Sequence, residues 1–398
     1  MLPAPAPAPA PASAPSRPTS APRGLPARRG VRSAAALALA AALVATLGAF
    51  TPAAPPTPST DRTGDPALAA LLRQAAADLP GQGFAASAGD ATGSAEAAIG
   101  RADSRPGAER ALTATTPQEI GSVTKSLTGL LLADAVARGE VTPATTLGEV
   151  HADRRLPAEL AATTLGELAT HTSGLPRLST RAQLRGYVTA FTHGNPYAWD
   201  TPDSLLCDAG TTPLRTPRGG FSYSNLGFAL LGQALAVRAG TPYPQLLRER
   251  VLVPLGMRAT AASPDPLPAG RARELAADGR EVAPWLSEGS VPAGTGVWST
   301  ASDLGLLAAA AATGELPGAQ ALVPVADADG LRTGWGWFTA VVDGRTFVGN
   351  NGATFGVQSS VWVEPATGRW VAVTAPSGTA DGSSHTETIA FRLLGAAG

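Results

Sequence analysis

The segment Ser122-Val123-Thr124-Lys125 places a hydroxyl and an amine three residues apart at the start of a predicted helix. Residues at this spacing lie on one helix face, so the two side chains can hydrogen-bond. A serine hydroxyl becomes a good nucleophile when a base removes its proton, and a lysine can be that base if burial lowers its pKa. Arginine could not, because it stays protonated. The pattern predicts a nucleophilic Ser122 activated by Lys125.

Lys125 is also the only lysine in the chain, since every other basic side chain among the 30 Lys and Arg residues is arginine. A Ser-x-x-Lys pattern alone recurs freely, and its serine is more often an ordinary helix N-cap. The coincidence of the only lysine with this position favours the catalytic interpretation.

A second polar group, Tyr223-Ser224-Asn225, comes just before an apolar helix. In isolation it would indicate a buried tyrosine and a helix-capping asparagine. Together with Ser122 and Lys125 it predicts a phenol that relays protons and a carboxamide that faces the same cleft.

The third group is Asn350-Asn351-Gly352-Ala353-Thr354, at the end of a predicted strand. As a bare pattern it is merely a turn. Gly352 would allow a ligand to approach the backbone closely, because glycine has no side chain. Asn350, Gly352 and Ala353 are therefore candidate substrate-binding residues.

The elements that must position these groups form an α/β (α+β type) pattern. Tight turns between the carboxy-terminal strands imply antiparallel neighbours, and two amino-terminal strands cannot form a sheet alone. We expect both ends to build one antiparallel sheet flanked by helices, with a mainly helical lobe inserted between them. The expected strands are 83–90, 94–100, 334–342, 345–348, 357–363 and 370–374. The main expected helices run from 122 to about 139, from 226 to 238 and from 387 to 394.

Three further helix starts follow from capping patterns. Thr164-Leu165-Gly166-Glu167 matches a capping box. Thr241-Pro242 fits an N-cap followed by proline in the first helical position, and Thr300-Ala301-Ser302-Asp303 suggests another start.

Residues 1–66 differ in composition from the rest. Residues 1–26 are a Pro/Ala repeat expected to be disordered, and 51–66 resemble a flexible linker. Between them the apolar run 33–50 follows a basic stretch, as in an export signal, although its length also suits a retained membrane anchor. The chain is therefore expected to be extracytoplasmic, either secreted or anchored by 33–50, with one hydrolase domain over 67–398.

Composition argues against several other functions. The net charge is −1, and the first 60 residues hold five arginines and no acid, so the remainder carries −6, which disfavours a nucleic-acid surface. No Gly-x-Ser-x-Gly occurs, which disfavours an α/β-hydrolase. The histidines lie far apart with no His-x-x-x-His pair, so neither a metal nor another cofactor is expected; they are His151, His171, His193 and His385.

The three groups, in this order, resemble the serine β-lactamase and D-alanyl-D-alanine carboxypeptidase superfamily, especially the branch of class C β-lactamases, D,D-carboxypeptidases and related esterases. The resemblance runs from about Phe84 to the carboxy terminus. The supporting segments are Ile120-Gly121-Ser122-Val123-Thr124-Lys125, Leu168-Ala169-Thr170-His171-Thr172-Ser173-Gly174-Leu175-Pro176, Phe221-Ser222-Tyr223-Ser224-Asn225 and Pro254-Leu255-Gly256-Met257.

This resemblance implies a β-lactamase/transpeptidase-like fold and a role for each matching residue. Ser122 would be acylated, Lys125 and Tyr223 would share proton transfer, and Asn225 would help to position the acyl group. The backbone N–H groups of Ser122 and Ala353 would form the oxyanion hole. The histidine in His-Thr-Ser-Gly-Leu-Pro belongs to a structural loop in such proteins.

One position departs from the family pattern. Relatives usually have Lys or His where this chain has Asn350, and that cation helps to hold a substrate carboxylate. Arg332 or Arg345 could supply the charge from a neighbouring strand. The expected function is a serine hydrolase that acts through an acyl-enzyme on a small-molecule or peptidoglycan-derived ester or amide, D,D-carboxypeptidase-like or esterase-like. The alternative is a penicillin-binding, peptidoglycan-sensing receptor that is acylated without efficient turnover.

Overall fold

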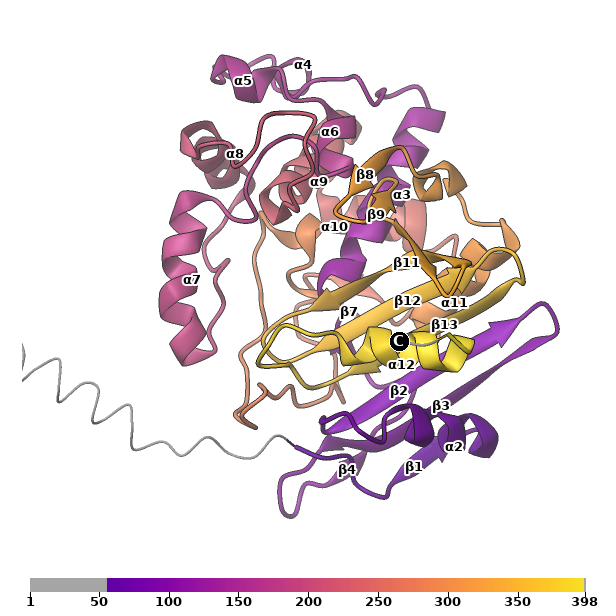
Figure 1. Cartoon of the computed structure of the whole chain (residues 1–398). Coiled ribbons are helices and arrows are strands. Elements are labelled where there is room, and N and C mark those ends of the chain that lie inside the picture. Colours follow the sequence, from indigo (N-terminus) through magenta and orange to yellow (C-terminus); the bar gives the residue numbers. More distant parts are fainter. Residues whose placement is uncertain (1–55, 397–398) are drawn as a thin grey trace, which may run out of the picture. The chain divides into compact units, whose positions relative to one another are not determined.

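A computed structural model describes residues 56–396. The expected Pro/Ala repeat and the apolar run 33–50 lie outside the described residues. The main sheet is antiparallel, with strand order β1-β3-β2-β13-β12-β11-β10-β9-β8 and β4 paired to β3 (Figure 1). Its strands are β1 (Arg62–Gly64), β2 (Gly83–Asp90), β3 (Gly93–Asp103), β4 (Arg110–Ala111), β8 (Ala326–Ala328), β9 (Leu331–Thr333), β10 (Phe338–Val342), β11 (Arg345–Ala353), β12 (Gln358–Glu364) and β13 (Arg369–Ala375).

The two ends of the domain meet in this sheet, as the sequence predicts. β2 pairs with β13, with Gly89 opposite Trp370. The expected linker 51–66 is shorter than predicted, because Arg62–Gly64 form β1 and pair with β3. Asp65 then caps the next helix by accepting a hydrogen bond from the Leu68 N–H at 2.7 Å.

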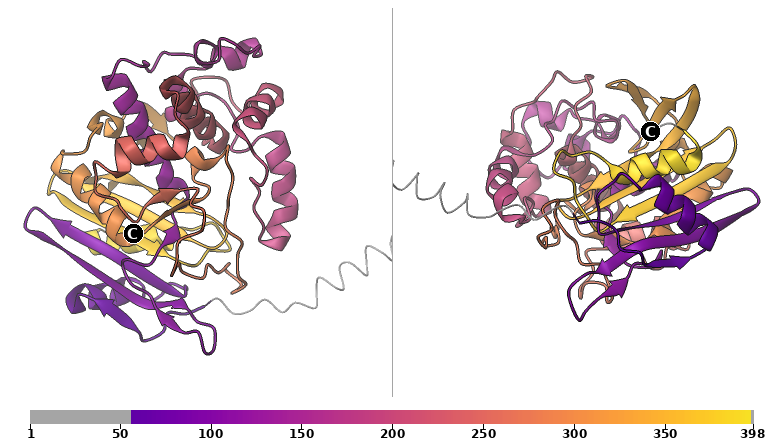
Figure 2. Two further views of the ribbon diagram at one scale, coloured as in Figure 1. Left: turned by 180° about the vertical axis from the view of Figure 1, so that it is seen from behind. Right: turned by 60° about the horizontal axis from the view of Figure 1, so that its bottom comes forward.

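Helices cover both faces of the sheet. α2 (Pro66–Ala75) and α12 (His385–Leu394) pack on one face, where Phe347, Trp362 and Phe391 form an aromatic cluster. α11 (Ala301–Thr313) packs on the other face, against β2, β12 and β13. Both views in Figure 2 show the carboxy-terminal strands enclosed between helices of the two chain ends and of the middle.

The middle of the chain is mainly helical and is built around α3 (Thr124–Ala137) and α9 (Asn225–Ala239). These two helices pack together and are buried on nearly all sides, which explains their apolar composition. The surrounding helices are α4 (Leu147–Val150), α5 (Ala158–Ala161), α6 (Leu165–Ala169), α7 (Thr180–Thr192), α8 (Pro202–Thr211) and α10 (Tyr243–Leu247). A small sheet joins β5 (Gln118–Glu119), β7 (Val297–Ser299) and β6 (Ala261–Ala262).

Two of the three capping predictions are confirmed. Thr164 makes the complete capping box of α6, and Thr300 Oγ1 accepts a hydrogen bond from the Asp303 N–H at 3.0 Å. The third is wrong, because α10 begins at Tyr243 with Pro242 at its N-cap and the Thr241 hydroxyl donates to the Ala239 carbonyl instead. Within residues 56–396, no helix is both long and apolar enough to cross a membrane.

Candidate active site

Ser122 lies in the short 3-10 helix η1 (Gly121–Val123), which runs directly into α3. Its Oγ accepts two hydrogen bonds of 2.8 Å, one from Lys125 Nζ and one from the Tyr223 hydroxyl. Tyr223 comes from the loop before α9, about 100 residues further along the chain. The structure therefore brings the first two predicted groups together at one oxygen atom of a half-buried residue.

Lys125 is fully buried, and Phe228 and Tyr223 line its surroundings. Burial lowers the pKa of its amine, since the charged form is poorly solvated there, although the negative charge that Tyr223 can carry opposes this effect. Nζ also donates a hydrogen bond of 2.5 Å to the Ala293 carbonyl in the 3-10 helix η3 (Val291–Ala293). A neutral amine held in this way can take the proton of Ser122.

The pKa of Tyr223 is lowered for a different reason. Burial alone would raise it, but the positive charge of Lys125, the hydrogen bond to Ser122 and the charge of Arg177 together outweigh burial. The Arg177 guanidinium lies 5.4 Å from the centre of the Tyr223 ring. The amine and the phenol thus stabilise each other's charged forms across Ser122, and either can carry a proton to or from it.

His171 does not contact Ser122. Its ring is fully buried, and Nδ1 accepts a hydrogen bond from the Ser224 N–H at 3.0 Å. Burial, followed by the charges of Lys125 and Arg177, holds its pKa well below the usual value. The ring lies 4.4 Å from that of Tyr223, so a neutral His171 supports the loop that carries the phenol. This agrees with the structural role expected for it.

Backbone groups close the site on the side of β11. β10 begins at Phe338, opposite Gly349, so it does not pair with the last residues of β11. That part of β11 faces Gly121 instead. A Cβ on Gly352 would lie 2.7 Å from the Ser122 nitrogen, and one on Gly121 would lie 2.7 Å from the Ala353 nitrogen. Only glycine permits this close approach of the main chains that carry the amides of Ser122 and Ala353, which are expected to form the oxyanion hole.

The side chains of the two predicted asparagines donate hydrogen bonds to other groups of the protein. Asn225 Nδ2 donates to the Tyr197 hydroxyl at 2.6 Å, and burial raises the pKa of that phenol to about 12. Asn350 is 3% exposed, and its Nδ2 donates to the Gly336 carbonyl at 2.9 Å. Its Nδ2 also lies 3.5 Å from the Ser122 carbonyl, so Asn350 lies beside the nucleophile, and its contact with a substrate stays a prediction.

Neither arginine suggested as a substitute cation reaches the site. Arg345 begins β11, and eight residues of extended strand separate it from Ala353 by about 25 Å. Its guanidinium binds Glu364 through two contacts of 2.7 Å. Arg332, on β9, is 56% exposed and lies 3.7 Å from Asp327 on the edge strand β8. The Tyr223 phenol instead has the guanidinium of Arg177 close to it.

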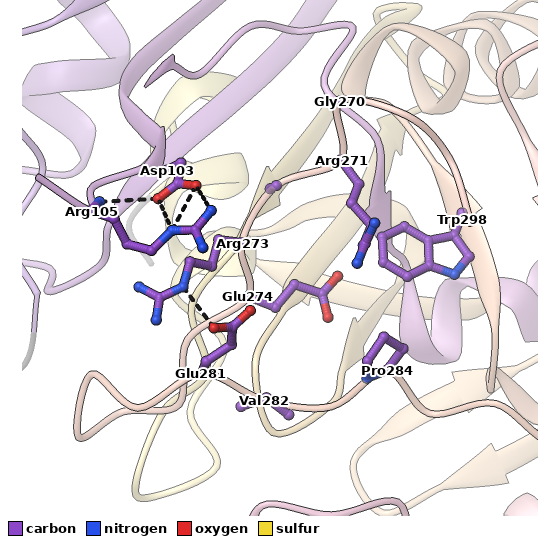
Figure 3. A pocket seen from close by; sticks show the side chains of 11 residues that line it. Asp103, Arg105, Gly270, Arg271, Arg273, Glu274, Glu281, Val282, Pro284 and Trp298 are labelled. Atoms are coloured by element: carbon purple, nitrogen blue, oxygen red, sulfur yellow. Dashed lines mark hydrogen bonds and ion pairs between the residues drawn. The ribbon is translucent and has the colours of Figure 1, made fainter. Parts of the chain in front are cut away.

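A pair of buried carboxyl groups secures the residues before Ser122. Glu119 accepts hydrogen bonds of 3.2 Å from the N–H groups of Trp285 and Gly296, and its own N–H donates to Glu274 at 3.1 Å. Burial raises the pKa of Glu119 to about 7, and burial together with the charge of Glu119 raises that of Glu274 well above its usual value. Figure 3 shows Glu274 in the wall of a cavity of about 190 Å³, between the Arg273–Glu281 ion pair and Trp298.

Sequence reasoning missed three contributors to the site. The Ala293 carbonyl and the Tyr197 hydroxyl come from segments without a recognisable motif. Arg177 carried a usable signal, because it directly follows His171-Thr172-Ser173-Gly174-Leu175-Pro176. The carbonyl of Arg177 accepts the N–H groups of Asn225 and Leu226 at 3.1 and 3.2 Å, which ties that loop to the start of α9.

This sheet, the helices around it and the Ser-Lys-Tyr cluster define a serine hydrolase of the β-lactamase and D-alanyl-D-alanine carboxypeptidase superfamily. A family model described as "Beta-lactamase" matches residues 68–394, and the chain belongs to that family.

Individual relatives agree with this assignment. A D-alanyl-D-alanine-carboxypeptidase/endopeptidase AmpH from Escherichia coli is 32% identical over 205 residues, which are 51% of this chain and 50% of that protein. The match thus spans about half the length of this relative. The fold is similar to that of a β-lactamase/D-alanine carboxypeptidase from Pseudomonas syringae, with a TM-score of 0.70, 16% identity and coverage of 83% and 99% of the two chains. A D-stereospecific amidohydrolase from Streptomyces gives a TM-score of 0.66 at 21% identity, covering 81% and 97%.

Proposed function

We propose that the protein hydrolyses ester or amide substrates through an acyl-enzyme on Ser122, with D,D-carboxypeptidase-like or esterase-like specificity. The observation that carries this proposal is the pair of 2.8 Å hydrogen bonds from Lys125 and Tyr223 to one Oγ. A single polar neighbour would be ordinary for a serine, but a buried amine and a phenol converging on it are what acyl transfer requires.

In the first half-reaction, Ser122 Oγ bonds to the substrate carbonyl carbon while its proton passes to Lys125 or Tyr223. The developing oxyanion lies near the amides of Ser122 and Ala353. The carbon–oxygen or carbon–nitrogen bond to the leaving group then breaks, and the leaving group takes that proton. In the second half-reaction, water gives a proton to the same groups and attacks the acyl carbon. The bond between that carbon and Ser122 Oγ then breaks, Oγ takes the proton back, and the acid leaves.

The substrate is proposed to be a small molecule or a peptidoglycan-derived fragment. Support comes from the family membership and from the carboxypeptidase/endopeptidase among the relatives. The apolar run 33–50 supports an extracytoplasmic location, where such fragments occur.

The test combines a short-chain nitrophenyl ester with a fluorescent penicillin, followed over time with the wild type and Ser122→Ala. We expect ester turnover to fall by roughly a thousandfold or more in Ser122→Ala, and the penicillin label to disappear from that variant. Full ester hydrolysis by Ser122→Ala would refute the proposal. Persistent label on the wild type without turnover of either compound would favour the receptor instead.

A further inference from the structure

A cavity of about 340 Å³ is lined in part by Arg177, whose guanidinium lies over the Tyr223 ring, and aromatic side chains form much of its wall. The rings of Tyr197 and Trp285 lie 5.4 Å apart, and those of Trp285 and Phe355 lie 5.0 Å apart, edge to face. Tyr187 and Leu178 extend this apolar lining. The cavity thus offers a continuous surface for a flat or apolar group.

Three residues of this wall are linked, by a hydrogen bond or through the nearby chain, to the segments that carry the predicted site residues. Tyr197 accepts a hydrogen bond from Asn225, and Phe355 follows Ala353 by two residues. The Trp285 main chain is held by Glu119, three residues before Ser122. A substrate attached to Ser122 through its carbonyl carbon therefore has this cavity beside it.

Arg177 adds a positive charge to the apolar lining. Its side chain is exposed, and within residues 56–396 no carboxylate lies within 4.0 Å of it. Most exposed arginines need no partner other than water, but this one lies over the Tyr223 ring in the wall of a cavity. The Trp285 indole N–H is buried and lacks an acceptor among the described residues.

We propose that Arg177 and this cavity form the subsite for the acyl portion of the substrate, and that it selects acyl groups in which a carboxylate is attached to an apolar or aromatic body. This inference rests on the proposed acyl-enzyme at Ser122. A guanidinium can bind a carboxylate through two parallel hydrogen bonds, while the rings cover the apolar part. Arg177 would then supply a positive charge near the nucleophile, where position 350 supplies none.

The experiment uses two nitrophenyl esters that differ only at the far end of the acyl group, 4-methylphenylacetate and 4-carboxyphenylacetate. We expect the wild type to prefer the carboxylate ester, and Arg177→Met to reduce that preference by roughly tenfold or more. The loss should lie mainly in KM for the carboxylate ester. Arg177→Lys keeps the charge and should retain part of the preference.

Arg181→Met is the matched control, because Arg181 is an exposed arginine on α7 that pairs with Asp208 at 3.6 Å. It should keep the wild-type ratio of the two esters. An equal ratio in the wild type and Arg177→Met, with hydrolysis still dependent on Ser122, would overturn the subsite alone. Unchanged hydrolysis by Ser122→Ala would overturn the proposed function and this inference with it.

Discussion

Two clusters of buried ionisable groups lie at the two ends of the segment Glu119–Lys125. At one end, Lys125 and Tyr223 both donate hydrogen bonds to Ser122. At the other, Glu119 and Glu274 each accept hydrogen bonds from main-chain N–H groups. Burial favours the neutral form in both, lowering the pKa of the amine and raising those of the carboxyls.

The two clusters differ in whether a substrate can reach them. Ser122 is only half-buried, so a substrate can reach it, and Lys125 in its neutral form can take the proton of its hydroxyl. Glu119 and Glu274 are 1% and 4% exposed, and their oxygens accept hydrogen bonds from the main chain. The same desolvation thus favours a base at Ser122, and at Glu119 and Glu274 it favours carboxyl groups that only hold the main chain in place.

The largest loss of activity should follow substitution of Lys125. Lys125→Arg keeps the positive charge but cannot accept a proton, so we expect nitrophenyl ester hydrolysis to fall by about a thousandfold. Lys125→Met, which is apolar and of similar length, should lose as much. Thermal unfolding distinguishes this from misfolding, and near-wild-type activity in a folded Lys125→Arg protein would show that Lys125 is not the base.

Removing the phenol should have a smaller effect with a characteristic pH signature. Tyr223→Phe should lower hydrolysis by about a hundredfold, because one route for the proton is lost. Activity rises with pH as Lys125 loses its proton, and the phenol's negative charge raises the pKa of that amine. Without it, the acidic limb of the pH–rate profile should move to lower pH. A move to higher pH would mean that another group controls that limb.

The carboxyl pair should affect stability and its pH dependence. A carboxyl with a raised folded pKa binds its proton more tightly when folded, so the free energy of unfolding falls as pH rises from the unfolded value of 4.5 through the folded pKa, which is about 7 for Glu119. Each tenfold difference in proton affinity between the folded and unfolded chain corresponds to about 1.4 kcal/mol. Glu274→Gln keeps an acceptor for the Glu119 N–H but cannot ionise, so its stability should fall less than that of the wild type between pH 5 and 8.

Urea unfolding of both proteins at the two pH values measures this difference directly. Titrating groups away from the Glu119–Glu274 pair contribute equally to both proteins and cancel. Parallel pH dependences in the wild type and Glu274→Gln would contradict the raised pKa of the pair.

The smallest effect should come from a substitution outside both clusters. Thr164→Ala removes the cap of α6, whose end leads into the loop of His171. We expect a loss of about 1 kcal/mol in unfolding free energy and no change in kcat for the ester. A fall in kcat would show that the loop's position depends on this cap, and would weaken the separation between scaffold and site.

The Ser-Lys-Tyr cluster could be located from the sequence because much of its signal is local. Ser122 and Lys125 share one helical turn, and short runs of strand-forming residues bounded by turns located β2, β12 and β13. β11 was predicted too short, ending at Val348, because Gly349 resembles a strand terminator. In the structure Gly349 continues the strand, and a Cβ there would lie 2.7 Å from the Trp362 ring. This glycine marks close packing instead of an end.

Contacts between distant segments could not be predicted in this way. Lys125 and the Ala293 carbonyl are 168 positions apart, and Glu119 and Glu274 are 155 apart, so both contacts depend on how separate loops meet. The two arginines suggested in place of the missing cation illustrate the limit. Arg345 lies on the right strand but at its wrong end, whereas Arg177 reaches the site from a loop.

The pairing of β2 with β13 also constrains the order of events during synthesis. The paired residues are about 280 positions apart, and the edge of β11 that faces Gly121 belongs to the same late-made part of the chain. A ribosome must therefore release the chain through β13 before the sheet can close and the amide of Ala353 can reach Ser122. Until then the nascent chain would carry its nucleophile without the environment that activates it, so acyl transfer can begin only after β13 has emerged.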